Sequence, residues 1–157
     1  MWMYKPDYLG RDISRRDYIR MILKRVRRSI KEFDFDEIRV KGGKDPLNKI
    51  GRKVLDEIGI HYKVVEENWN TSFIPLEDFI IEFVRSIYED KLEDMRKKVY
   101  PFFRVPREEV AMLGEKYGIK YSPKSSDLDW FLEKIFEIGP TIKFSWVNGI
   151  LFILRGA

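Results

Sequence analysis

Two glycines between a predicted strand and a predicted helix constrain the fold more than any other feature of this sequence. Residues 37–41 alternate as a strand does, and the segment 41–46 reads Lys-Gly-Gly-Lys-Asp-Pro. Apolar residues at helical spacing predict a helix over 47–58, and Gly59 stands where a helix commonly ends. Residues 60–66 form a second predicted strand. Strand, loop, helix and strand in this order predict a parallel β-α-β crossover.

The glycine-rich loop has the chemistry of an anion site. Gly42 and Gly43 let the backbone turn tightly with its N–H groups exposed, and the N-terminus of the next helix adds partial positive charge. Lys44 adds a positive side chain, and Asp45 is placed to cap the helix or to help hold a metal ion. These features suit a phosphate group. The alternative is a plain strand-to-helix turn with solvated lysines.

The most basic stretch of the chain is a predicted helix from Ser14 to about Phe33. Ser14 is a good N-cap residue, and apolar residues at helical spacing form one stripe. The candidates for contact with a nucleic acid are the cations Arg16, Arg20, Lys24, Arg27 and Arg28. Each cation that meets a phosphate releases counterions and gives affinity without reading sequence. Like charges four residues apart favour a neutralising partner, either a nucleic acid or the acidic run at 89–94.

The second half of the chain is predicted to be mainly helical. Residues 67–75 form a polar loop, and Trp69 stands out there as a candidate for stacking on a base. Three further helices are predicted, over 76–98, 106–118 and 127–138. Local chemistry indicates a β-hairpin for residues 141–155, because apolar residues alternate and Asn148-Gly149 is a strong turn signal.

Composition excludes several kinds of site. The 157 residues contain no cysteine and only one histidine, His61, which excludes disulfides, iron–sulfur clusters, zinc sites built on cysteine and His-rich metal sites. No signal peptide and no apolar run of about 20 residues is visible, so we expect a cytoplasmic protein without membrane contact.

Length and charge set further expectations. The length fits one domain, residues 1–157, with the aromatic-rich arm 1–13 folded back on it. The net charge of +4 permits an anionic partner. Charged residues make up 36% of the chain, a balance that resembles the surface of a thermophile's protein.

The glycine-rich loop resembles the PP-loop, Ser-Gly-Gly-x-Asp-Ser, of the ATP pyrophosphatase superfamily. The basic helix before it is similar to the one in the tRNA 2-thiolation enzymes, and Leu76-Glu77-Asp78 is similar to their Leu-Asp-Asp segment. Residues 103–111 resemble their Arg-x-x-Pro-Glu-Lys-Glu-Val-Ala stretch, and 131–133 with 141–145 resemble their C-terminal helices. The pieces follow in the right order over most of the chain. The loop departs from the PP-loop signature at two positions, where Lys41 and Pro46 replace the two serines.

This resemblance implies a shortened α/β fold of the adenine nucleotide alpha-hydrolase type. In such a fold a small parallel sheet has flanking helices and the C-terminal half is helical, including 141–155. The resemblance also implies ATP or AMP as a ligand, with Gly42, Gly43, Asp45 and Asp78 as its contacts. Lys44 joins this set because of its place in the loop.

The function expected from the resemblance is nucleotide or phosphate binding in RNA metabolism, with tRNA or another RNA as partner. Sulfur transfer is lost because the catalytic cysteines of the thiolating enzymes are absent. Whether the chain hydrolyses ATP stays open. Two alternatives also remain: a non-catalytic RNA-binding module that uses the basic helix 15–31, or a subunit or homo-oligomer whose surplus aromatic side chains form a protein interface.

Overall fold

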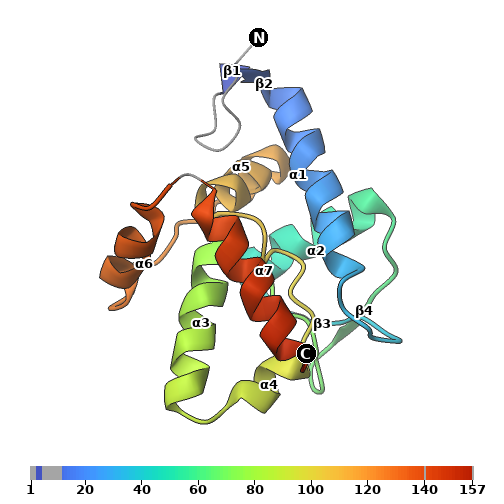
Figure 1. Cartoon of the computed structure of the whole chain (residues 1–157). Coiled ribbons are helices and arrows are strands. Elements are labelled where there is room, and N and C mark those ends of the chain that lie inside the picture. The colour runs from blue at the N-terminus through green and yellow to red at the C-terminus, as the bar shows by residue number, and fades with distance from the viewer. Residues whose placement is uncertain (1–2, 5–11, 140, 157) are drawn as a thin grey trace.

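The computed structural model describes residues 3–4, 12–139 and 141–156 and is drawn in Figure 1. The helices are α1 (Arg15–Ile30), α2 (Pro46–Ile58), α3 (Leu76–Tyr88), α4 (Leu92–Arg96), α5 (Arg107–Tyr117), α6 (Asp129–Phe136) and α7 (Ile142–Leu154). The strands are β1 (Met3–Tyr4), β2 (Ile13–Ser14), β3 (Arg39–Lys41) and β4 (Lys63–Val65). The fold is α/β with a small parallel sheet, flanking helices and a helical second half, as predicted.

The β-α-β unit forms as its sequence indicates. Strands β3 and β4 pair in parallel, with Val40 opposite Val64, and α2 connects them. Gly59 ends α2 in the left-handed conformation at a φ of 74°. Ser14 caps α1 by accepting a hydrogen bond from the Asp17 amide at 3.2 Å. Most of the expected N-terminal arm (1–2 and 5–11) lies outside the described residues, whereas β1 pairs antiparallel with β2.

The sheet extends beyond β3 through segments that the sequence did not reveal. Thr71 bridges Val40 on one side and Val99 on the other, both in parallel. The order across the sheet is therefore β4, β3, Thr71 and Val99. The prediction of a polar loop over 67–75 is wrong for its centre, because Thr71 and Asn70 are buried. The Asn70 amide group is satisfied there: its Oδ1 accepts from the Arg39 amide, and its Nδ2 donates to the Glu37 carbonyl, both at 2.8 Å.

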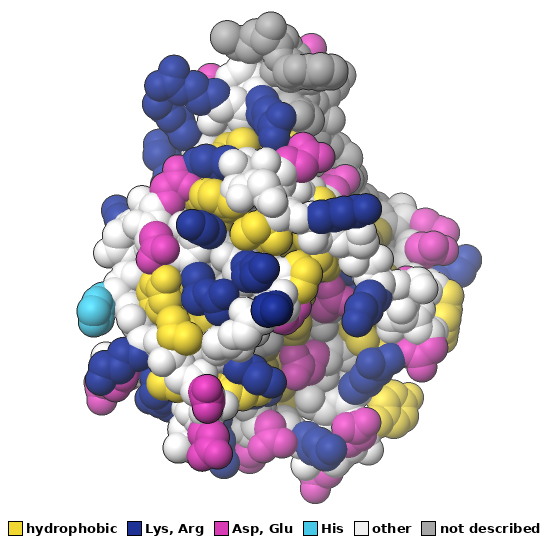
Figure 2. Space-filling view, turned by 180° about the vertical axis from the view of Figure 1, so that it is seen from behind, with side chains coloured by type: hydrophobic (Ala, Val, Ile, Leu, Met, Phe, Trp, Pro, Cys, Tyr) yellow, Lys and Arg dark blue, Asp and Glu magenta, His cyan; other side chains and the backbone are white. Residues whose placement is uncertain are grey.

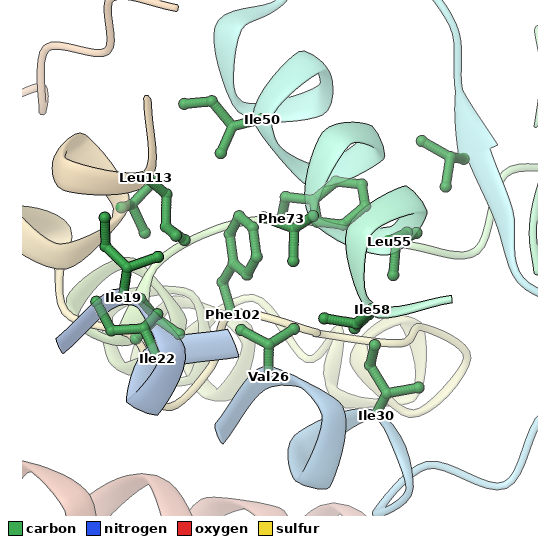
Figure 3. Close-up of a cluster of buried hydrophobic side chains, with 14 of the residues drawn as sticks. Ile19, Ile22, Val26, Ile30, Ile50, Leu55, Ile58, Phe73, Phe102 and Leu113 are labelled. Atoms are coloured by element: carbon green, nitrogen blue, oxygen red, sulfur yellow. The ribbon is translucent and has the colours of Figure 1, made fainter. Parts of the chain in front are cut away.

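Two clusters of apolar side chains form the core. The first joins α1, α2 and α5 around Phe73 and Phe102, whose rings lie 5.3 Å apart (Figure 3). The second joins α3, α4, α6 and α7 around Tyr100 and Phe103, and both rings pack on Phe79. Side chains of the segment 99–105 pack alternately into the two clusters. The segment therefore links the clusters both through its backbone and through its packing.

Two helix predictions need correction. The single helix expected over 76–98 is wrong, since the chain breaks at 89–91, where Asp90 adopts a left-handed φ of 54°. The break suits the sequence because this run is polar and interrupts the apolar stripe. The hairpin indicated for 141–155 is also wrong, and the helix implied by the family resemblance is confirmed as α7. Burial of Val147, Ile150 and Leu151 against the second cluster outweighs the local turn signal.

Candidate functional site

The glycine-rich loop leaves the carboxyl end of β3, where the order of the sheet reverses. From β3 the chain first adds β4 on one side and later adds Thr71 on the other. Ligands of open α/β sheets bind outside the carboxyl ends of the strands at such a point. A cleft of about 450 Å³ lies here, with the loop and Asn48 on one side and Trp69, Thr71 and Ser72 on the other.

The backbone amides of the loop divide into occupied and available donors. The Gly42 amide donates to the Val65 carbonyl at 3.0 Å, and the Leu47 amide donates to Oδ1 of Asp45 at 3.4 Å. Within the described part of the chain, the amides of Gly43, Lys44 and Asp45 donate to no protein group. Three consecutive N–H groups are thus available to a ligand.

The loop conformation depends on Gly43 and on an arginine that sequence reasoning missed. Gly43 has a φ of 112°, which residues with a side chain rarely adopt, and an added Cβ would meet nothing within 4 Å. Arg52 of α2 donates to the Lys41 carbonyl at 3.3 Å and to the Gly43 carbonyl at 3.2 Å. The guanidinium therefore holds two carbonyl groups of the loop. Nothing in the sequence distinguishes Arg52 from the other cations of α2.

The charge around the available amides is mainly positive. Lys41 and Lys44 are exposed at the loop, and the N-terminus of α2 adds the partial charge of its free N–H groups. Asp45 contributes one negative charge and is engaged as the cap of α2. Pro46 occupies the first turn of α2, where it removes one N–H from the cradle. The arrangement favours an anion that accepts hydrogen bonds from backbone groups.

Asp78 lies near this cleft but not in it. It lines an adjoining cavity, and its carboxylate accepts from Arg107 through Nη2 at 2.7 Å and Nε at 3.2 Å. Burial lowers the pKa of Arg107, but the hydrogen bond and charge of Asp78 outweigh it and raise this pKa above its ordinary value. Burial, followed by the charge of Asp78, raises the pKa of Tyr121 to about 12, and Asp45 adds a smaller effect. Tyr121 thus lies within electrostatic reach of both acids.

The five candidate cations of the basic helix α1 lie in different surroundings. Arg20, Lys24 and Arg28 line one groove of about 540 Å³, and Arg16 is exposed. Arg27 instead donates to the Ile58 carbonyl at the end of α2. On the face opposite to that of Figure 1, Lys and Arg are widely spread, and Asp and Glu gather mainly in the lower half (Figure 2).

The acidic run at 89–94 does not act as the intramolecular partner of α1. Its described ion pairs are local, Glu89 with Lys91 and Glu93 with Arg96. Helix α1 instead forms ion pairs with α5, where Arg15 pairs with Glu115 at 3.3 Å and Arg25 pairs with Glu109.

The aromatic side chains are mostly internal, and the exposed ones among the described residues lie at the end of α3, where Tyr88 is 88% exposed, and on the last two helices. Trp130 and Phe152 are about three-fifths exposed, at 62% and 61%, and Trp146 is 36% exposed. The Phe131 ring contacts both tryptophans at 6.1 Å between ring centroids.

None of the helices in the described ranges is long and apolar enough to cross a membrane.

A scan against protein-family models gives no match, and a search of the curated proteins gives none either. Among solved structures, the chain is similar to the U34-tRNA thiolase NcsA from Methanococcus maripaludis, determined with its [4Fe-4S] cluster. The TM-score is 0.61 at 16% sequence identity, over 98% of this chain and 84% of the thiolase chain. This chain has no cysteine to supply thiolate ligands, so its residues do not fit such a cluster. What it shares with the thiolase is the fold, over nearly its whole length.

Proposed function

We propose that this chain binds the phosphate groups of a nucleotide, ATP or AMP, at loop 42–45 and acts in tRNA modification or a related part of RNA metabolism. The observation that carries the proposal is the set of three available amides, at Gly43, Lys44 and Asp45, in a cleft at the point where strand order reverses. The fold shared with a tRNA thiolase supports the link to RNA.

The binding chemistry follows from the groups in the cleft. Phosphate oxygens accept hydrogen bonds from the three amides, and Lys41 and Lys44 offset the charge of the ligand. The Arg52 guanidinium of α2 donates hydrogen bonds to the Lys41 and Gly43 carbonyls. These two hydrogen bonds hold the loop backbone in the conformation that leaves its amides available to the phosphate. Asp45 fixes the first turn of α2 and thereby the position of the neighbouring amides.

In this function the loop binds phosphate groups, and the chain does not transfer sulfur. A thiolate nucleophile is absent from the chain, and Lys41 and Pro46 leave the loop without the two hydroxyl groups of the PP-loop signature. The residues present can hold and neutralise a phosphate, and they include no nucleophile near it of the kind that thiolation uses.

The test is calorimetric titration of the protein with ATP, AMP and inorganic tripolyphosphate at low salt. Gly43→Asp places a carboxylate among the amides and should weaken the binding of all three by at least about tenfold. Gly118→Asp is the matched control, since Gly118 also has a positive φ, of 70°, and open space for a Cβ. The proposal fails if the wild-type protein binds none of the three, or if both variants bind alike.

A second candidate function, RNA binding, is supported by the groove along α1. Arg20, Lys24 and Arg28 lie at successive turns along it and could follow a phosphate backbone. Reversal of these three charges should weaken tRNA binding and lower the slope of log K against log salt by about 2–3. The matched control reverses three exposed lysines elsewhere, Lys53, Lys97 and Lys120. Equal loss in both triple variants would exclude a specific role for the groove.

A further inference from the structure

Strand β4 forms one end of the sheet, and its outer edge is open. The order across the sheet is β4, β3, Thr71 and Val99, so β4 has a neighbour on one side only. In the part of the chain that the structure describes, no strand pairs with the other side. Such an edge presents unpaired backbone groups, and an extended chain can add to the sheet there.

The backbone groups that face the open edge belong to Val64. The Lys63 amide donates to the Ile38 carbonyl at 2.9 Å. The Val65 carbonyl accepts from the Gly42 amide at 3.0 Å. Both residues thus direct backbone groups toward β3. Because these groups alternate along a strand, the N–H and C=O of Val64 point away from β3.

The edge lacks most of the features that commonly keep strands apart. Natural proteins shield an open edge with a lysine, a proline or a bulge. No proline stands among residues 61–67, and the one lysine, Lys63, pairs with Glu37 of its own chain at 3.2 Å. Val64 at the centre is apolar, β-branched and 56% exposed. The edge therefore combines free backbone groups with an exposed side chain that favours strand pairing.

The order of charges along the edge favours a second copy of this chain as the partner. Lys63 is near the start of the segment 61–67, and Glu66 and Glu67 end it. Antiparallel pairing centred on Val64 places Lys63 diagonally across from Glu67 of the second copy, within reach of a long side chain. Two-fold symmetry forms this contact twice. Parallel pairing in register would instead place like charges side by side.

We propose that two copies of this chain pair antiparallel through β4, on a two-fold axis between the two Val64 residues, and form one continuous sheet. In this register each Val64 amide donates to the Val64 carbonyl of the other copy, and the two valine side chains pack on the same face. His61 lies opposite Glu67 of the second copy. The paired segment is short, so the interface is small and the dimer forms at micromolar concentrations. The pairing does not depend on phosphate binding at loop 42–45.

Analytical ultracentrifugation of the full chain, from micromolar to near-millimolar concentrations, should show a monomer–dimer equilibrium. Val64→Lys places two ammonium groups opposite each other and should weaken the dimer at least about tenfold. Ile87→Lys is the matched control, since Ile87 is 58% exposed but lies on α3, outside the edge. His61→Lys should tighten the dimer about threefold, because it adds a charge opposite to that of Glu67.

A cross-link tests the register. The chain has no cysteine, so Val64→Cys introduces a single thiol on the proposed axis. Residues that form a hydrogen-bonded antiparallel pair have Cα atoms about 5.5 Å apart, a separation that suits a disulfide. Mild oxidation should therefore convert Val64→Cys into a covalent dimer, whereas Ile87→Cys should stay largely monomeric. If Val64→Lys proves to be unfolded by circular dichroism, this cross-link decides.

Three results would overturn the inference. The first is a wild-type protein that stays monomeric at every concentration. The second is a Val64→Cys variant that cross-links no faster than Ile87→Cys. The third is a dimer that persists unchanged in Val64→Lys, and loss of that dimer in Trp130→Lys would place the interface on the exposed aromatic side chains of α6 and α7 instead.

Discussion

Glu109 is fully buried in the first turn of α5, and its environment explains why. Its Oε2 accepts from the Tyr18 hydroxyl at 2.6 Å, and its Oε1 pairs with Arg25 of α1. Acidic residues in a first turn suit the helix dipole, which accounts for exposed Glu108 but not for a carboxylate placed in the core. The pair therefore joins α1 to α5 beside the first cluster.

Loss of this carboxylate should destabilise the fold. Glu109→Gln removes the buried carboxylate that pairs with the mostly buried Arg25 guanidinium, and we expect the free energy of unfolding to fall by about 3 kcal/mol. Glu108→Gln, one residue earlier and exposed, should change it by less than about 0.5 kcal/mol. Urea denaturation of the two variants measures both values. Equal stabilities would mean that the buried pair contributes nothing specific.

Helices α2 and α7 each contain a glycine, and the two glycines differ in what surrounds them. A Cβ on Gly51 of α2 would lie 2.4 Å from the buried Phe73 ring, so this helix packs closely on the sheet segment. A Cβ on Gly149 of α7 would meet nothing within 4 Å. The first glycine is required by packing, whereas the second only lowers helix propensity.

The same substitution should therefore have opposite effects in the two helices. Gly149→Ala should stabilise the protein by about 0.5–1 kcal/mol because alanine favours the helix. Gly51→Ala should destabilise it by about 1–3 kcal/mol because Phe73 has to move. Thermal and urea unfolding of both variants check the signs. A stabilising Gly51→Ala would show that α2 does not approach the sheet this closely.

Elements with local signals were predictable, and those held by distant partners were not. The ends of α2 are set by Asp45, Pro46 and Gly59, and all three are visible in the sequence. The sheet positions of Thr71 and Val99 rest on single bridges, which are too short to leave a pattern of alternating residues.

The same limit applies to the candidate site. The glycine-rich loop could be recognised from its residues. The contact of Arg52 with the loop and the place of Trp69 in the lining of the cleft depend on tertiary contacts between separate segments. The engagement of Asp78 by Arg107, 29 residues away, is of the same kind.

The two core clusters should unfold as one unit, which is what a single domain over the described residues requires. Segment 99–105 places Phe102 in the first cluster and Phe103 in the second, so neither cluster can open without disturbing the other. We expect Ile22→Val in the first cluster and Ile80→Val in the second to lower the midpoint of one shared thermal transition. Far- and near-ultraviolet circular dichroism should report the same midpoint. Two separated transitions would divide the molecule into independent units.

The availability of the loop amides to an anion is tested most directly by nuclear magnetic resonance. A ¹⁵N-labelled sample is titrated with tripolyphosphate, and the amide signals are followed residue by residue. We predict saturable shifts that are largest at Gly43, Lys44 and Asp45, with little change at Gly42, whose amide is already bonded to Val65. Shifts confined to α1, or none at the loop when the ligand is in excess, would contradict the phosphate site.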